Sequence, residues 1–318
     1  MMPFISQQMR QHGTIFLEEP PEPGFGQMLG GVLSIDDYLL TLDVEYPEFS
    51  RRMCDLLCEL HQDGKQIFQV EPFLRVLLEI HAFFADGHDP VEIKGDAFRY
   101  PVYLAERNAT GALLNYYQTV MNGSFDETVT AVKQFARMDA ARFRLRDLMR
   151  GRALVSLVKK YSSSYIEAGV IHYPLWRLLR ERMPGQLSVK PIFLSDAALK
   201  AIGERGPIFG PGDQLTLYYI FHPGIKSTAR DILLSARAII YSKIIEKEER
   251  TDDLSTFPHL RDELACIGTT KQLLLDDCRR LFPLVRRAKS ADARHIVAEY
   301  LAEFKPQFRN SRKESEPR

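Results

Sequence analysis

The sequence lacks the long apolar runs of membrane and secreted proteins. A membrane-spanning helix needs roughly 20 predominantly apolar residues, and even the apolar segment at residues 73–85 is interrupted by Arg75, Glu79 and His81. Residues 1–13 carry glutamine and arginine where a secretory signal would have an apolar core. We therefore expect a cytoplasmic protein with no membrane partner.

Cysteine is scarce, and neither sign of charge is in excess. The chain of 318 residues has four cysteines and no Cys-x-x-Cys pair, a pattern that argues against a structural zinc site and predicts free thiols in a reducing compartment. Basic and acidic residues are balanced at 42 each. A balanced charge provides no general attraction for nucleic acid, so we expect no nucleic-acid partner.

Short β-prone segments alternate with amphipathic helices in the first part of the chain. Ser34 and Asp37 form a capping box at the start of one helix, and Pro72 suits the first position of another. Such alternation is typical of a parallel sheet with helices packed on its faces. The predicted strands are residues 14–17, 65–70, 165–168, 189–194 and 215–221, with a loop at residues 88–110 and a long helix from Ser124 to Met149, before Gly151.

Beyond residue 225 the pattern is helical, without a strand. Helices are predicted at residues 228–250, 258–267, 270–288 and 290–304. We therefore predict an α/β fold, a mostly parallel sheet flanked by helices, with an all-helical C-terminal portion. The predicted division is an α/β domain at residues 1–224, a helical portion at residues 225–306 and a disordered polar tail at residues 307–318.

Ionisable residues follow three of the predicted strands. Glu18 and Glu19 follow the first, Glu71 follows the second, and the segment from Glu167 to His172 lies at the end of the third. Because ligands of parallel sheets bind beyond the carboxyl ends of the strands, this edge is suited to general acid–base catalysis or to a divalent metal. Adjacent residues of an extended chain point in opposite directions, so we expect only one of the first pair at the site. Glu71 could equally cap a helix or pair with an arginine.

Three histidines are considered as candidate functional residues. His172 follows Gly169 at the start of a helix, where the positive end of the helix dipole predicts a lowered pKa and a neutral imidazole, unless the ring only forms a local cap. His222 follows a predicted strand and is a further candidate metal ligand. His259 shares a helical face with Glu263 and is interpreted as part of a surface pair. No serine or cysteine lies in a Gly-x-Ser-x-Gly context.

Several motifs occur in a fixed order between residues 12 and 195. They are a Glu at the end of an early strand, Gly31-x-x-Ser34-x-x-x-Tyr38, Pro47-x-Phe49, an Arg146-Asp147 helix, and a strand that closes in Gly169-x-x-His172. This order resembles the TraB/Tiki and ChaN group of the erythromycin-esterase-like superfamily. In that group, Tiki relatives have a metal-dependent peptidase site built from two Gly-x-x-His motifs and a Glu, ChaN-like members are linked to haem or iron, and esterase-like members to hydrolysis.

The resemblance implies a hydrolase with Glu18 or Glu19, His172 and nearby Arg146 as its catalytic residues. The implied divalent-metal ligands are Glu19 and His172, with His222 as the further candidate named above. The group's first Gly-x-x-His motif is expected about one helix before the strand that ends at Glu18, and residues 1–11 resemble only the end of that helix. We expect either that this motif is absent or that the coding start lies further upstream.

Three functions are compatible with these residues. The first is a hydrolase-like domain acting on a small-molecule or peptide ligand at a cleft lined by a Glu and a His and roofed by the C-terminal helices. The second is a non-catalytic protein that keeps the fold and binds a ligand or partner. The third is haem or iron binding through His81 or Tyr38. A homodimer is among the expected assemblies.

Overall fold

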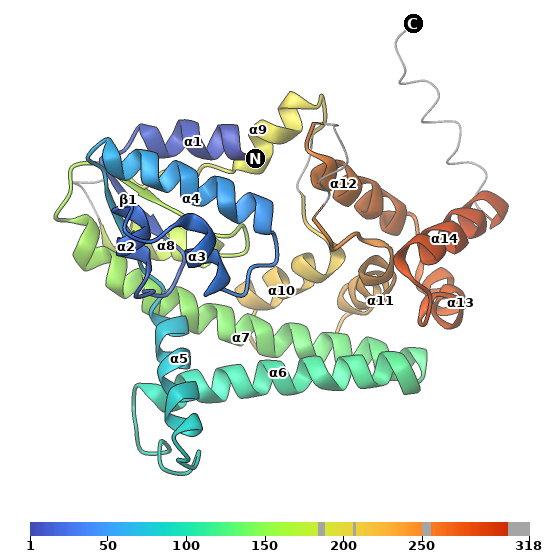
Figure 1. Cartoon of the computed structure of the whole chain (residues 1–318). Helices are drawn as coiled ribbons and strands as arrows, with labels where there is room; N and C mark the ends of the chain where they lie inside the picture. Colours follow the sequence, from blue (N-terminus) through green and yellow to red (C-terminus); the bar gives the residue numbers. More distant parts are fainter. Residues whose placement is uncertain (184–187, 206–207, 250–255, 305–318) are drawn as a thin grey trace, which may run out of the picture. The chain divides into compact units, whose positions relative to one another are not determined.

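The computed structural model describes residues 1–183, 188–205, 208–249 and 256–304 (Figure 1). The chain forms two compact units, which consist of Met1–Thr110, Arg137–Pro207 and Glu248–His259 in the first and of Gly111–Ala136, Ile208–Lys247 and Leu260–Arg318 in the second. The domain boundary expected near residue 225 therefore falls inside the second unit. The predicted tail, residues 307–318, lies outside the described residues.

The first unit contains a parallel sheet of three strands. They are β1 (Thr14–Leu17), β2 (Gln66–Gln69) and β3 (Ser164–Ile166), in the order β2-β1-β3. Thr14 of β1 is in register with Gln66 of β2 and Ser164 of β3. The α/β class predicted from the sequence is thus confirmed, as are the first three predicted strands.

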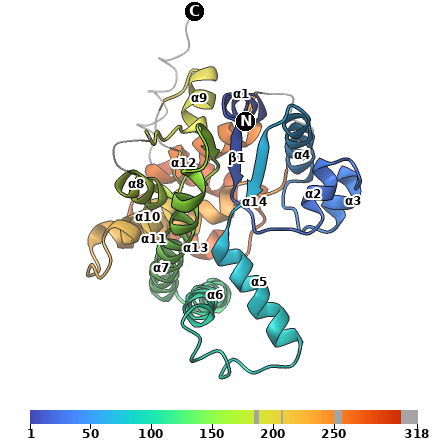
Figure 2. The ribbon, with the colours of Figure 1, turned by 90° about the vertical axis from the view of Figure 1, so that its left-hand side faces the viewer.

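Helices cover both faces of this sheet, and β1 is buried from end to end. Ile15 and Leu17 point into one apolar cluster with Met9 and Leu57, whereas Phe16 points into the other, because successive side chains of a strand alternate in direction. Figure 2 shows α4 on one side of the sheet and α8 on the other. The helices that contribute residues to the first unit are α1 (Met2–Arg10), α2 (Phe25–Leu29), α3 (Ile35–Leu40), α4 (Pro47–Gln62), α5 (Pro72–Ala85), α6 (Arg99–Asn122), α7 (Phe125–Val158), α8 (Tyr173–Arg182) and α9 (Leu194–Ala201).

The described residues of the second unit form helices joined by loops, without a strand, as predicted for the C-terminal portion. Besides parts of α6 and α7, it contains α10 (Pro211–Phe221), α11 (Ala229–Ile244), most of α12 (Pro258–Lys271), α13 (Leu275–Val285) and α14 (Ser290–Phe304). Within the described part of the chain, no helix is both long and apolar enough to cross a membrane.

Two predicted strands are wrong. Residues 189–193 have no regular structure and α9 begins at Leu194. Residues 215–221 belong to α10, which Pro211 starts after Gly210, with the Asp213 carboxylate accepting the Gly210 N–H at 3.1 Å. The aromatic and apolar residues of this segment resemble a strand by composition, but the helix start at the proline decides the local structure.

Two helix boundaries also differ from the prediction. Part of the loop expected at residues 88–110 is helical, because α6 begins at Arg99. Gly151, expected to end the long helix, lies inside α7, which continues to Val158. The glycine serves packing instead, since a Cβ atom at Gly151 would overlap the Leu178 side chain of α8.

This packing leads to a prediction for Gly151→Ala. Alanine is the better helix former by about 0.5–1 kcal/mol, but overpacking against Leu178 should cost more, on the order of 1–3 kcal/mol. We therefore expect a lower melting temperature for this variant in thermal unfolding. Gly111→Ala in α6, where a Cβ atom meets nothing within 4 Å, is the control and should raise it. A Gly151→Ala variant as stable as wild type would contradict the close packing.

Candidate functional site

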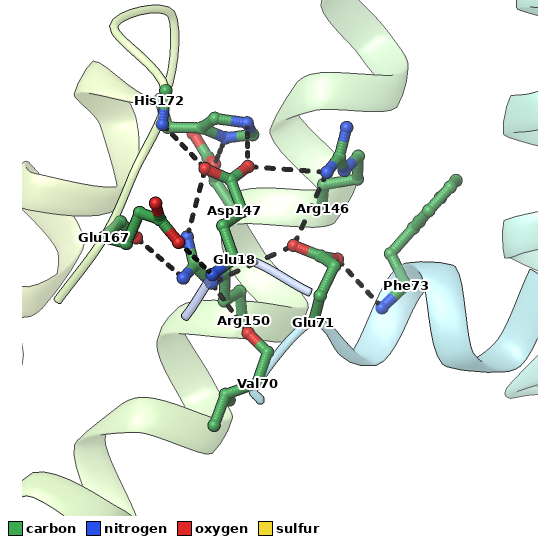
Figure 3. A network of polar contacts seen from close by, with 10 residues as sticks. Glu18, Val70, Glu71, Phe73, Arg146, Asp147, Arg150, Glu167 and His172 are labelled. Carbon is green, nitrogen blue, oxygen red and sulfur yellow. Dashed lines mark hydrogen bonds and ion pairs between the residues drawn. The ribbon is translucent and has the colours of Figure 1, made fainter. Parts of the chain in front are cut away.

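Seven ionisable residues meet at the carboxyl edge of the sheet (Figure 3). After β1 the chain adds β2 on one side and then crosses to place β3 on the other, so the edge between β1 and β3 is a topological switch point, where ligands of open α/β sheets bind. Glu18 directly follows β1 and Glu167 directly follows β3. We call these seven residues the switch-point network: Glu18, Glu71, Arg146, Asp147, Arg150, Glu167 and His172.

Arg150 lies at the centre of the network. Its guanidinium is fully buried and donates from Nε to the Val70 carbonyl at 2.8 Å and from Nη2 to the Glu167 carbonyl at 2.7 Å. It thereby joins the ends of β2 and β3. Burial lowers the pKa of Arg150, and the neighbouring carboxylates Glu18 and Glu71 oppose this effect.

Glu71 combines the two roles that its sequence position suggested. Its Oε1 accepts the N–H of Phe73 at 3.2 Å and so caps α5, while its Oε2 lies 3.6 Å from Arg146 Nη2. Burial raises the pKa of this carboxyl group, although Arg146 and Arg150 act against the rise. Glu71 is therefore closer to the neutral form than an exposed glutamate would be.

His172 is held between two carboxylates. Its Nε2 lies 2.7 Å from Glu18 Oε1, and its Nδ1 is hydrogen-bonded to Asp147 Oδ1. Since a carboxylate accepts, both ring nitrogens must donate, which requires the protonated imidazolium. Burial alone would lower the pKa of His172, but the two carboxylates raise it to about 9.

The predicted neutral imidazole is therefore wrong. His172 does lie at the start of α8, but the helix dipole is a weaker influence than two direct charge-assisted hydrogen bonds. Asp147 was not predicted as the partner of His172, because it lies 25 positions away in the sequence. Its place in the Arg146-Asp147 motif was the available signal.

Glu18, and not Glu19, belongs to the network. Glu18 Oε2 accepts the Gly169 N–H at 2.6 Å. Burial would raise the pKa of Glu18, but His172, then the charge of Arg150 and the Gly169 N–H, lower it to about 2. Glu19 is exposed and accepts a hydrogen bond from Gln69 at 2.9 Å.

Glu167 lies directly after β3, at the start of the segment from Glu167 to His172 that the sequence pointed to. Its Oε2 accepts the backbone N–H of Glu18 at 3.1 Å. Burial raises the pKa of Glu167 to about 7, with the Glu18 N–H opposing and the charge of Glu19 reinforcing the rise. This carboxyl group can therefore gain or lose a proton near neutral pH.

Arg146, which the resemblance placed near the catalytic residues, is held more loosely than Arg150. Its Nη2 lies 3.5 Å from Glu18 Oε1, and its side chain is 15% exposed. Four buried atoms of the network have no hydrogen-bond partner, namely Arg146 Nε, Arg150 Nη1, Glu71 Oε2 and Asp147 Oδ2. Buried polar atoms are rarely left unpaired, and two of these four, Arg150 Nη1 and Glu71 Oε2, lie 3.5 and 3.6 Å from oppositely charged groups of the network.

The residues do not fit the divalent metal that the resemblance implied. Both ring nitrogens of His172 are engaged by carboxylates, and Glu19 points elsewhere. His222 belongs to the second unit, where it follows helix α10 and not a strand, with Nδ1 3.0 Å from the Tyr218 carbonyl. In the described ranges of the chain, no group of three or more His, Cys, Asp or Glu residues is placed to hold a metal ion.

The haem or iron candidates are not part of the switch-point network either. His81 is an exposed residue of α5. Tyr38 is buried in α3, with its hydroxyl 3.4 Å from Gln69 Nε2. Neither residue contacts the seven members of the network through a hydrogen bond or ion pair described for this chain.

Comparison with known proteins assigns no activity. No family model matches the chain, and no solved structure is similar to it. A protein of Archaeoglobus fulgidus, described as uncharacterized, is 26% identical over 280 residues, which make up 88% of this chain and 92% of that protein. The likeness to the TraB/Tiki and ChaN group therefore stays a prediction.

The first prediction for the site concerns the charge of His172. Because the folded pKa of about 9 exceeds the ordinary value of 6.5, its stabilising effect is complete below pH 6.5 and is lost as the pH rises through 9. Nitrogen-15 NMR of labelled histidine should show both ring nitrogens of His172 protonated at pH 7. Asp147→Asn should lower the pKa by at least one unit. A neutral His172 at pH 7 in the wild type would contradict the two-carboxylate geometry.

The second prediction concerns Glu167. Its folded pKa of about 7 lies above the ordinary 4.5, so its contribution to stability is lost as the pH rises from 4.5 through 7. In Glu167→Gln this pH-dependent loss of stability is absent, because glutamine does not ionise. Relative to wild type, we expect the free energy of unfolding of the variant to gain up to about 3 kcal/mol between pH 4.5 and pH 8. Urea denaturation at both pH values, with Glu19→Gln as the exposed control, measures this; equal behaviour of the two variants would refute it.

Proposed function

We propose that this chain is a hydrolase that works by general acid–base catalysis at the switch point between β1 and β3. The observation that carries the proposal is the convergence of Glu18, Glu167 and His172 from the strand ends with Arg146 of α7. Buried charges cost stability, and groups with strongly shifted pKa values gather at catalytic sites. Both considerations favour a chemical role for the network.

Glu167 is the proposed base. With a pKa of about 7, it is partly ionised at neutral pH, which is the condition for efficient proton transfer in both directions. It would accept a proton from water as the water oxygen attacks a carbonyl carbon, and return the proton to the leaving alcohol or amine as the C–O or C–N bond breaks. The substrates would be small-molecule or peptide esters or amides.

Arg146 is the proposed stabiliser of the negative charge that develops on the carbonyl oxygen. Its contacts with Glu18 and Glu71 are long, at 3.5 and 3.6 Å, so its guanidinium can turn toward a new acceptor at little cost. Donors aimed at a developing oxyanion in a buried site contribute strongly to rate. The Asp147–His172–Glu18 chain would hold the surrounding groups in place.

We also propose that the protein acts in the cytoplasm. Cys54, Cys58 and Cys266 are free thiols, and two of them, Cys54 and Cys266, are buried. Unpaired cysteines are the usual state in reducing compartments.

Non-catalytic ligand binding is the second candidate, and one observation favours it. His172 has both ring nitrogens engaged, and Arg150 directs two donors at main-chain carbonyls. A network that satisfies itself in this way leaves few groups for substrate. Under this reading, Arg146 would bind an anionic ligand that raises the melting temperature without being turned over.

The experiment compares two carboxyl-to-amide variants on a panel of chromogenic esters, anilides and phosphoesters. Removing a general base lowers the rate by about 10²–10⁴-fold, so Glu167→Gln should lose at least 100-fold in kcat. Glu19→Gln, the exposed neighbour, leaves the Glu167 carboxyl group in place and removes only a charge that raises its pKa, so kcat on the plateau above pH 7 should stay within about twofold of wild type. The kcat of the wild type should rise with pH to a plateau above about 7, as Glu167 ionises.

The controls separate the alternatives. Activity should survive EDTA, since the described residues offer no group of three metal ligands; loss with EDTA and recovery with zinc would restore the metal-dependent reading. Absence of turnover on the whole panel, with a thermal shift by small anions that Arg146→Leu abolishes, would favour the binding protein. Equal kcat values for Glu167→Gln and Glu19→Gln would remove Glu167 from the mechanism.

A further inference from the structure

The C-terminal half of α6 is devoid of charge. Residues 108–125 contain no Asp, Glu, Lys, Arg or His, although 26% of the chain is Asp, Glu, Lys or Arg. From Gly111 onward, this part of the helix belongs to the second unit. A surface helix of a monomer normally presents charged side chains to water, so the uncharged run needs an explanation.

Large apolar side chains occupy the outward face of this half-helix. Leu114, Tyr117 and Met121 are 55%, 53% and 48% exposed, respectively. Their spacing of three and four residues places them on one face, and we call them the α6 stripe. The exposed residues beside it, Asn115, Gln118 and Asn122, are polar and neutral.

The opposite face of the helix is already used within the second unit. The Tyr116 hydroxyl lies 3.1 Å from Ser242 Oγ of α11, and the Val120 carbonyl accepts a hydrogen bond from Arg286 Nε at 2.8 Å. Ala112 is buried. These contacts fix the rotation of α6 about its axis, so the stripe is the face that the unit leaves uncovered.

We propose that the α6 stripe is the contact face of a homodimer, in which α6 packs antiparallel against the same helix of a second copy. The stripe is symmetric about its own middle, since Leu114 and Met121 lie at equal distances from the point between Tyr117 and Gln118. With the twofold axis at that point, Leu114 faces the partner's Met121 and Tyr117 lies beside the axis.

Charge and symmetry favour a second copy over an unrelated partner. Around a twofold axis a surface meets its own image, so any charged residue close to the axis would face a like charge. A run without charge is what such self-pairing requires, whereas it offers nothing to a partner selected by opposite charge. Enrichment in Tyr and Met with depletion of Lys and Glu is also the composition of interface cores.

One helix pair buries less than the roughly 1,200 Å² of a standard stable interface. The dimer should therefore be reversible and depend on protein concentration. Sedimentation equilibrium of the full chain, from low micromolar to several hundred micromolar, should show a mass that rises above the monomer's 36.5 kDa. A monomer at every concentration overturns the proposal.

Two lysine variants test the surface. Tyr117→Lys places like charges beside the axis and should raise the dimer dissociation constant at least tenfold. Leu284→Lys, on α13 of the same unit and 58% exposed, is the matched control and should dimerise like wild type. Both should keep the helical circular-dichroism signal and melting temperature. Dimerisation unaffected by Tyr117→Lys would show that another surface is responsible.

A cross-link tests the geometry. Gln118→Cys brings a thiol beside the axis, so mild oxidation of concentrated protein should give a disulfide-linked dimer. Asp276→Cys, in the first turn of α13, serves as the control and should give none. A dimer that forms without a cross-link at position 118 would exclude the antiparallel α6 pair.

Discussion

The buried guanidinium of Arg150 is the constraint on which the arrangement of the first unit depends. Removing such a cation from water costs several kcal/mol even after the protein relaxes. The Val70 and Glu167 carbonyls, at the ends of β2 and β3, accept two of its hydrogen bonds. The remaining charge must be balanced, and Glu18 Oε2 lies 3.5 Å from its Nη1. Because one buried cation binds the ends of both outer strands, the carboxylates that balance its charge lie at the same edge of the sheet.

The balance of charge in the network shifts the pKa values of its carboxyl groups in opposite directions. Three cationic groups, from Arg146, Arg150 and His172, stand against four carboxyl groups. The pKa of Glu18 is lowered to about 2 and that of Glu167 is raised to about 7. Groups in one site whose pKa values are driven apart are the usual signs of separate acid–base roles. In the proposed mechanism, Glu18 is the fixed anion and Glu167 is the group that exchanges a proton.

The parts of the fold that local sequence determines could be predicted. The Ser34 side chain caps α3 by accepting the Asp37 N–H, and the Glu71 side chain caps α5 by accepting the Phe73 N–H. In both cases the capping residue and its partner lie within three residues of each other. The failures arise where a local pattern has two meanings. Gly151 looks like a helix end but provides space for Leu178, and the apolar segment from Leu215 looks like a strand but lies in α10.

The candidate site was predictable as a location but not as a set of contacts. The rule that ligands bind beyond strand ends pointed to Glu18 and His172. The pairing of His172 with Asp147 and Glu18 joins positions 25 and 154 residues apart, so no periodicity or motif spacing encodes it. Since that pairing makes the imidazole a cation, the charge of the site followed from tertiary structure alone.

The amino and carboxyl ends of the three strands are connected by different kinds of contact. At the amino edge, His12 Nδ1 lies 2.7 Å from Ser163 Oγ, and Lys65 Nζ donates to the carbonyls of Arg10 and His12. These contacts connect the starts of all three strands with half-exposed side chains. Apolar residues can replace a buried ion network at equal or greater stability, so the concentration of buried charge at the carboxyl edge, where ligands of such sheets bind, supports a role in chemistry and not in folding alone.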